Sequence, residues 1–136
     1  MEGSDRYLDK FSDSGKRVLE GALNESRRRD HKYISPEYIL YALIKEETEL
    51  FESAMRNLSV DSNSVRSVVE AHLENSRRHT GKGFRISPET TNLFKISMDK
   101  ARSGNRRVIG ASDILYVLVT DKYSVLNKIL QNLDQN

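Results

Sequence analysis

Cysteine is absent from the 136-residue sequence, and proline occurs only twice. The absence of cysteine excludes a disulfide scaffold, a thiolate metal site and a cysteine nucleophile. Apolar runs long enough to span a bilayer are also absent, and residues 1–10 lack the apolar stretch of a secretory signal. We therefore expect a cytoplasmic domain with no membrane contact.

Apolar residues recur at spacings of three and four along nearly the whole chain, and period-two alternation nowhere extends far. The two prolines each follow a serine, at Ser35-Pro36 and Ser87-Pro88, a pattern typical of a helix N-cap and first helical residue. We predict an all-α fold with no sheet. Its seven helices are expected at residues 13–28, 36–46, 50–57, 62–77, 88–103, 111–120 and 124–132.

The sequence also repeats itself. A shift of 75 residues aligns residues 11–58 with 86–133 without a gap, and the pattern Ile-x-x-x-x-Ile-Leu-Tyr-x-Leu recurs at 34–43 and 109–118. Chance helical patterning would match the apolar class but not keep identities in register over three helices, so we infer an internal duplication. We predict one domain, 1–136, in which repeat one (11–75) and repeat two (86–133) are joined by a loop (76–85) and pack around a pseudo-twofold axis.

No catalytic constellation is recognisable in the sequence, because it contains no phosphate loop, no HExxH, no GxSxG and no dinucleotide fingerprint. The three histidines are scattered. His72 falls on the apolar stripe of the helix at 62–77, where a hydrogen-bonded interfacial histidine is expected rather than a metal ligand. We predict that this chain by itself is not an enzyme and binds no metal or cofactor.

The two copies carry further motifs. Phe11-Ser12 precedes the first helix, and His31-Lys32-Tyr33-Ile34-Ser35-Pro36-Glu37 leads into the second; residues 86–88 and 108–119 repeat this arrangement. Over about residues 9–133 the pattern resembles the tandem Clp N-terminal repeat of Clp-type AAA+ unfoldases. The resemblance implies a domain that recognises unfolded or tagged substrates and adaptor proteins for an ATP-driven hexamer, which feeds a protease or disaggregates proteins. ATP and magnesium would then bind only to downstream ATPase modules.

Two other functions stay open at this point. A stand-alone Clp-repeat protein would regulate by competing for adaptors. An anionic-polymer or nucleic-acid binder would use the arginine clusters at 27–29, 77–79 and 106–107, which would have to converge on one face. Because the first and last clusters occupy equivalent loops of the two repeats, we expect them to lie apart. Nucleic acid is therefore not the partner that we predict.

The resemblance also implies paired ligand sites, since some Clp proteins bind phosphorylated arginine at one site per repeat. A helix start suits the phosphate and a carboxylate suits the guanidinium group. Ser12 and Glu37 would form the first site, whereas in the second Ser87 is paired with Ser112 in place of glutamate, and Asp113 lies about 100° further around its helix. We predict binding chiefly at Ser12 and Glu37. Alternatively, both serines are simple N-caps and Glu37 only favours its helix dipole.

Overall fold

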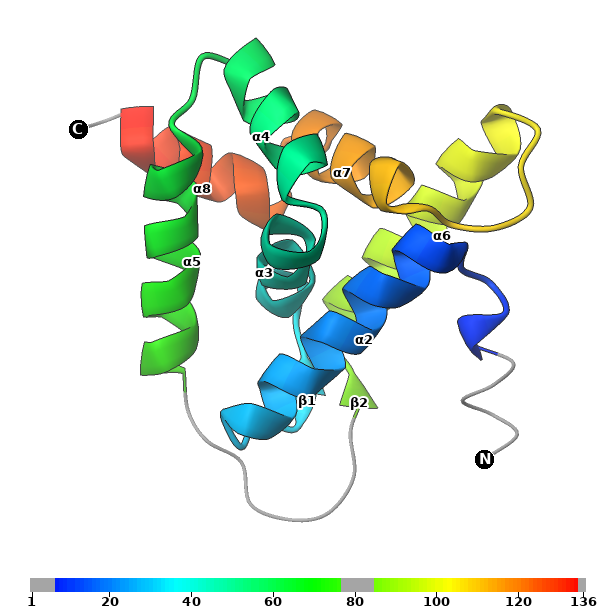
Figure 1. The fold of residues 1–136 in the computed structure, drawn as a ribbon, viewed down its shortest axis with the longest axis horizontal. Coiled ribbons are helices and arrows are strands. Elements are labelled where there is room, and N and C mark those ends of the chain that lie inside the picture. The colour runs from blue at the N-terminus through cyan, green and yellow to red at the C-terminus, as the bar shows by residue number, and fades with distance from the viewer. Residues whose placement is uncertain (1–6, 77–84, 135–136) are drawn as a thin grey trace.

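The computed structural model describes residues 7–76 and 85–134. Helices account for most of them, in agreement with the predicted all-α class (Figure 1). The bounds of four helices coincide with the predicted ones, and those of the other three differ by at most two residues. The elements are α2 (Asp13–Arg28), β1 (Tyr33–Ile34), α3 (Pro36–Glu46), α4 (Thr48–Asn57), α5 (Ser62–Asn75), β2 (Arg85–Ile86), α6 (Pro88–Ser103), α7 (Ala111–Thr120) and α8 (Val125–Asp134).

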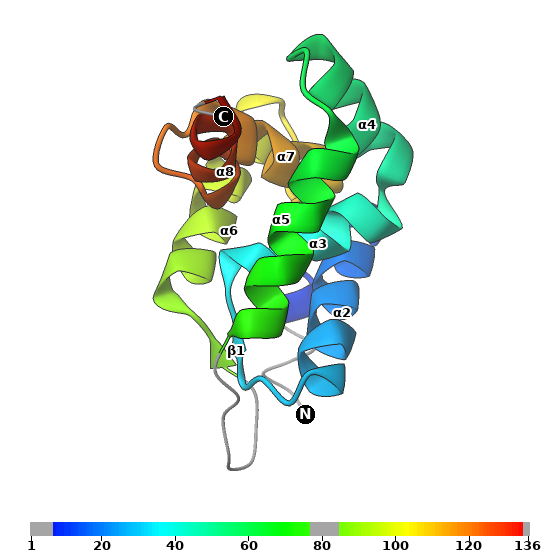
Figure 2. The ribbon, with the colours of Figure 1, turned by 90° about the vertical axis from the view of Figure 1, so that its left-hand side faces the viewer.

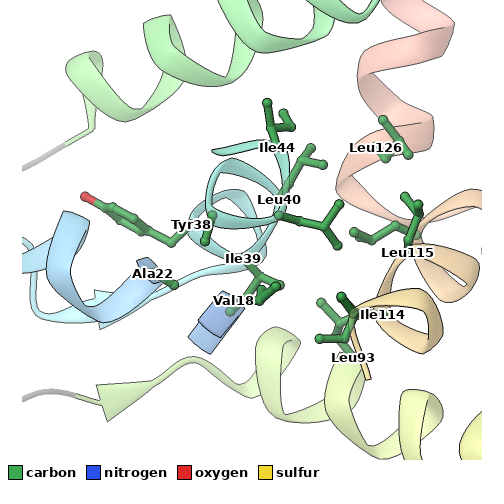
Figure 3. Packing of buried hydrophobic residues seen from close by; sticks show 14 of the residues in the cluster. Val18, Ala22, Tyr38, Ile39, Leu40, Ile44, Leu93, Ile114, Leu115 and Leu126 are labelled. Atoms are coloured by element: carbon green, nitrogen blue, oxygen red, sulfur yellow. The ribbon is translucent and has the colours of Figure 1, made fainter. Parts of the chain in front are cut away.

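Helix α3 forms the centre of the domain. It packs against α2, α4, α5, α6 and α8, which surround it in two perpendicular views (Figures 1 and 2). Seen end-on, its side chains point in several directions: Ile39 lies toward Val18, whereas Leu40 points toward Leu115 and Leu126 (Figure 3). Ile39 and Leu40 are fully buried. A helix that is apolar on every side is stable only in such a surrounded position.

The prediction of no sheet was wrong in one place. β1 and β2 form a parallel pair of two residues each, with Ile34 opposite Ile86. An isolated parallel bridge also joins Phe11 to Ile109. Strands this short show no sequence period, and their pairing joins segments that lie far apart in the chain, so helical periodicity could not reveal them.

These two backbone contacts are the same contact made twice. Under the 75-residue shift Phe11 is equivalent to Ile86, and Ile34 to Ile109. Each segment before the first helix of one repeat therefore pairs with the segment before the second helix of the other repeat. The N–H group after each segment follows the same rule, because residue 12 donates to the carbonyl of Ile109 at 2.9 Å and residue 87 to that of Ile34 at 3.2 Å.

The crossed contacts differ at one residue. In repeat two the hydroxyl of Thr90 donates to the carbonyl of Ile34 at 2.8 Å. The equivalent residue in repeat one is Gly15, where an added Cβ would lie only 2.2 Å from the carbonyl oxygen of Ile109. The backbone of α2 thus approaches the other repeat more closely than a larger residue would allow.

The predicted loop at 76–85 lies largely outside the described residues; Ser76 is the C-cap of α5 and Arg85 begins β2. Among the helices that are described, none is long and apolar enough to cross a membrane.

Candidate functional site

Ser12 and Ser87, the predicted ligand hydroxyls, both act as helix N-caps. The Ser12 Oγ accepts the N–H of Gly15 at 3.3 Å. The Ser87 Oγ accepts the N–H of Thr90 at 3.2 Å and donates to the Thr90 Oγ1 at 2.9 Å. Ser87 is also buried, with 8% of its surface exposed. The capping role that we left open as an alternative is therefore present at both positions.

The predicted pairing of Ser12 with Glu37 as a ligand site stays a prediction, but the structure puts these two residues in different surroundings. Glu37 lines the same groove as Ser87, not as Ser12. Ser12 lies instead at the entry to α7, where a Cβ added to Gly110 would be 3.3 Å from its Oγ, and this helix start also carries Ser112. The cause is the crossed backbone pairing, which brings the start of the first helix of each repeat to the start of the second helix of the other.

Glu37 and Ser87 both line a hollow between the two repeats, which we call the inter-repeat groove. It has a volume of about 430 Å³ and collects residues from the starts of α3 and α6, from the end of α7 and from α8. This volume lies in the lower part of the roughly 300–1,000 Å³ range of ligand pockets. The lining residues are Ser35, Pro36, Glu37, Ser87, Glu89, Asn92, Leu93, Ile96, Val117, Leu118, Asp121, Tyr123, Ser124, Val125 and Lys128.

Glu37 has a neighbour that the sequence did not predict. The His72 Nε2 on α5 lies 3.1 Å from the Glu37 Oε2. His72 was expected on the buried face of α5, but its side chain is 59% exposed; the buried face consists of Val65, Val69 and Leu73. The Glu37 side chain is 22% exposed, so the carboxylate remains accessible from solvent beside this contact.

The equivalent site at the start of α7 is occupied by the protein itself. The Ser14 Oγ accepts the N–H of Ala111 at 2.9 Å and lies 3.2 Å from the Ser12 Oγ. An oxygen of Asp113 accepts the N–H of Gly110 at 2.9 Å. Two of the backbone donors that an anion would use at this helix start, those of Gly110 and Ala111, are therefore already bound by side chains.

Asp113 turns back onto the start of α7, where its carboxylate is bound within the protein. It is 1% exposed, and its two oxygens accept bonds of 2.6 Å from the two terminal nitrogens of Arg106. Burial opposes the ionised carboxylate, but the hydrogen bonds from Arg106 and Gly110 outweigh it and hold the pKa of Asp113 below its ordinary value. Asp113 is thus a structural anion, not a ligand group.

The two arginine clusters within the described residues, at 27–29 and 106–107, do not converge. Arg28 and Arg29 bond the buried carboxylate of Glu25 at 2.5 and 2.6 Å, and the hydrogen bond from Arg28 lowers the pKa of Glu25 despite its burial. Arg106 is bound to Asp113. The end of α2 and the end of α6, which carry these arginines, lie at opposite ends of the domain (Figure 1). Residues 77–79 lie outside the described part of the chain.

A second hollow lies between α2 and α3, and its lining carries charges of both signs. This hollow of about 470 Å³ is lined by Arg17, Glu20, Gly21, Asn24, Glu25, Arg28, Tyr41, Ala42, Lys45 and Glu46. Its cations and carboxylates are equal in number, and Arg28 and Glu25 already bond each other. Among residues 7–76 and 85–134 no group of three or more potential ligands that could hold a metal ion occurs.

Comparison with known proteins decides the family. A sequence profile described as the Clp repeat (R) N-terminal domain matches residues 10–133. The chain belongs to this family. Among curated relatives, the ATP-dependent Clp protease ATP-binding subunit ClpC of Staphylococcus aureus is 26% identical over 127 residues. That match covers 93% of this chain and 15% of ClpC, so the chain spans only a small part of the length of the relatives that it matches.

Solved structures agree with the Clp repeat fold. The N-terminal domain of the ClpV1 ATPase from the E. coli EAEC Sci1 T6SS has a TM-score of 0.79 at 22% identity, covering 98% of this chain and 82% of that one. The Hsp104 N-terminal domain from Candida albicans has a TM-score of 0.78 at 14% identity, covering 90% and 81%. A third structure, described by a peptide from the EAEC T6SS Sci1 SciI protein, has a TM-score of 0.79 at 21% identity, covering 93% and 80%. At these identities the likeness shows the fold alone.

Most of the inter-repeat groove of this Clp repeat domain was missed by sequence reasoning. Glu89 lies on α6, Lys128 on α8, and Asp121 and Tyr123 in the turn between α7 and α8, and no motif links them. Only Glu37 and Ser87 were singled out, and they were assigned to different sites. These residues can be grouped from the sequence only if the contacts between the two repeats are already known.

Proposed function

We propose that this Clp repeat domain recognises protein substrates and adaptors for an ATP-dependent Clp unfoldase, and that the inter-repeat groove is the recognition site. The parent would supply the ATP-binding modules, and this domain would contribute no catalysis. The cytoplasmic location and the division of residues 1–136 into two repeats remain parts of this proposal.

The observation that carries the proposal is a groove built jointly by both repeats. The apolar residues at its base are joined by polar residues at its edge, an arrangement typical of sites that bind peptide segments. Tyr123 stands at the edge with 71% of its surface exposed, more than any other large hydrophobic side chain among the described residues, and tyrosine is enriched among the residues that dominate binding interfaces. Membership of a family that includes the N-terminal part of ClpC supports the same function.

The crossed structure also changes where we place a phosphoarginine-like ligand. We propose one site, at Glu37 with Ser87, in place of the predicted Ser12 and Glu37 pair. The second candidate, at Ser12 and Ser112, is weakened twice: it lacks the carboxylate, and Ser14 fills the helix start. Calorimetry with arginine phosphate is expected to give at most one site per chain, lost in Glu37→Ala.

The proposal is tested by comparing how the domain binds the unfolded and the native form of the same protein. Fluorescently labelled ribonuclease A, reduced and blocked with iodoacetamide, is permanently unfolded, and the native enzyme has the same composition. We expect saturable binding of the unfolded form to the 136-residue chain, measured by anisotropy, and no binding of the native form. Tyr123→Ser is expected to weaken binding about fivefold or more, since truncating an aromatic contact residue costs ~1–2 kcal/mol when that residue contributes to the interface.

Tyr116→Ser is the matched control, because Tyr116 is also an exposed tyrosine, at 47%, but does not line the groove. Equal binding of native and unfolded ribonuclease would contradict the proposal, as would equal effects of the two tyrosine variants. A stand-alone regulator would show the same binding, so the proposal concerns the site and not the length of the natural protein.

A further inference from the structure

The lining of the inter-repeat groove points to a partner chemistry: we propose that it binds an extended peptide segment in which positively charged and apolar side chains alternate. This inference rests on the proposed function and adds the class of segment that is selected. The cationic side chains would contact the edge of the groove and the apolar ones its base.

The edge of the groove carries an excess of negative charge. Three carboxylates line it, those of Glu37, Glu89 and Asp121, against the single ammonium group of Lys128. Glu37 and Glu89 both lie in the first turn of their helices, and Asp121 directly follows α7. The imbalance is local, because the α2–α3 hollow has equal numbers of both signs. A recess lined by one sign of charge concentrates the field and favours partners of opposite sign.

The base of the groove is apolar and belongs to the core. Leu93, Val117 and Leu118 are at most 7% exposed, so a ligand would meet only small parts of them. Ile96 and Val125 are partly buried and extend the apolar surface toward solvent. A purely charged ligand would leave this apolar surface exposed to water, whereas every second side chain of an extended segment, if apolar, would cover it.

Tyr123, at the edge of the groove, is held in place by hydrogen bonds within the turn between α7 and α8. The N–H of Tyr123 donates to the Asp121 Oδ1 at 3.0 Å, and the Asn127 Nδ2 donates to the Asp121 carbonyl at 2.7 Å. The Ser124 Oγ donates to the Leu118 carbonyl at 2.5 Å. A turn with its backbone bonded in this way is ordered before a ligand arrives, which lowers the entropic cost of binding. The Lys122 Nζ lies 4.9 Å from the centre of the Tyr123 ring, so a cation of the protein itself already contacts this aromatic surface.

The proposal is tested by measuring how tightly four labelled peptides of the same length bind the 136-residue chain. One alternates arginine and leucine, a second replaces arginine by glutamate, a third replaces leucine by serine, and a fourth carries phosphorylated arginine. We expect the arginine–leucine peptide to bind at least tenfold more tightly than the glutamate peptide and at least threefold more tightly than the serine peptide. We also expect it to bind no more weakly than the phosphorylated one.

Charge reversal on the protein gives the matched comparison. Glu89→Arg is expected to weaken binding of the arginine–leucine peptide about three- to tenfold, because it turns an electrostatic attraction at the groove edge into a repulsion. Glu49→Arg is the control, since Glu49 is likewise an exposed glutamate in a first helical turn, that of α4, but lies outside the groove. It is expected to change affinity less than twofold.

Equal affinity for the arginine and glutamate peptides overturns the inference, and so does equal weakening by the two charge reversals. A serine peptide that binds as well as the leucine peptide overturns the role of the apolar base. Tighter binding of the phosphorylated peptide overturns the inference that the groove selects positively charged side chains. Each of these results leaves the proposed function intact if unfolded ribonuclease still binds, whereas failure to bind unfolded ribonuclease overturns the proposed function itself.

Discussion

Replacing Gly15 by alanine is expected to destabilise the domain, although alanine is the better helix former. The new Cβ would lie 2.2 Å from the carbonyl oxygen of Ile109 and 3.3 Å from its carbon. The start of α2 must therefore move by about 1 Å from the other repeat, which weakens the 2.9 Å hydrogen bond from the residue-12 N–H to that carbonyl. Overpacking costs ~1–3 kcal/mol and a weakened hydrogen bond ~0.5–1.5 kcal/mol, against ~1 kcal/mol gained in helix propensity.

The net loss in unfolding free energy is about 1–3 kcal/mol, a fall of roughly 4–12 °C in Tm, measurable by calorimetry or by circular dichroism. Gly21→Ala in the same helix is the control. There the new Cβ would meet the flexible Glu46 Cγ at 3.1 Å and the Ala42 Cβ at 3.3 Å, so a change within about 1 kcal/mol is expected. If Gly15→Ala were as stable as Gly21→Ala, the close crossing of the two repeats would be refuted.

Three further predictions concern the core, a buried ion pair and nucleotide. Phe51→Ala, at a fully buried position of α4, is expected to cost ~3–5 kcal/mol in urea unfolding, and a loss below 1 kcal/mol would contradict the packing. Asp113→Asn is expected to cost ~1–3 kcal/mol at neutral pH by breaking the pair with Arg106. Since the folded pKa of Asp113 lies below its ordinary value of 3.8, its contribution is present above that value and is lost as the pH falls through the folded pKa. The stability difference between wild type and variant should therefore shrink in urea titrations below about pH 4, and a constant difference would disprove the linkage. The chain alone is expected neither to bind ATP tightly nor to hydrolyse it, and turnover abolished by a point mutation within these residues would show otherwise.

Local signals in the sequence were sufficient to locate the helices. Serine followed by proline marked the starts of α3 and α6, because proline favours the first helical position and serine the cap. Boundaries without such signals, at the start of α4 and the ends of α5 and α8, were displaced by two residues. The strands β1 and β2 were missed because a two-residue strand carries no period.

The site could not be assembled from the same signals. Internal repetition shows which residues are equivalent, but it does not show which repeat an individual residue contacts. We assumed that each repeat forms its own site, whereas the crossed backbone bonds bring Glu37 of repeat one to Ser87 of repeat two. Asp113 was expected to point elsewhere, but its side chain bonds back to the N–H of Gly110 at the start of α7, as an acidic residue three positions after an N-cap can do.

An NMR titration of the ¹⁵N-labelled chain with the unlabelled unfolded ribonuclease tests the central claim most directly, because it locates binding without any mutation. We predict that the amide shifts change at the starts of α3 and α6, around residues 35–37 and 87–96, and at the α7–α8 turn and α8, around residues 117–128. Changes confined to the starts of α2 and α7, near Ser12 and Ser112, or to the α2–α3 hollow would contradict recognition in the inter-repeat groove.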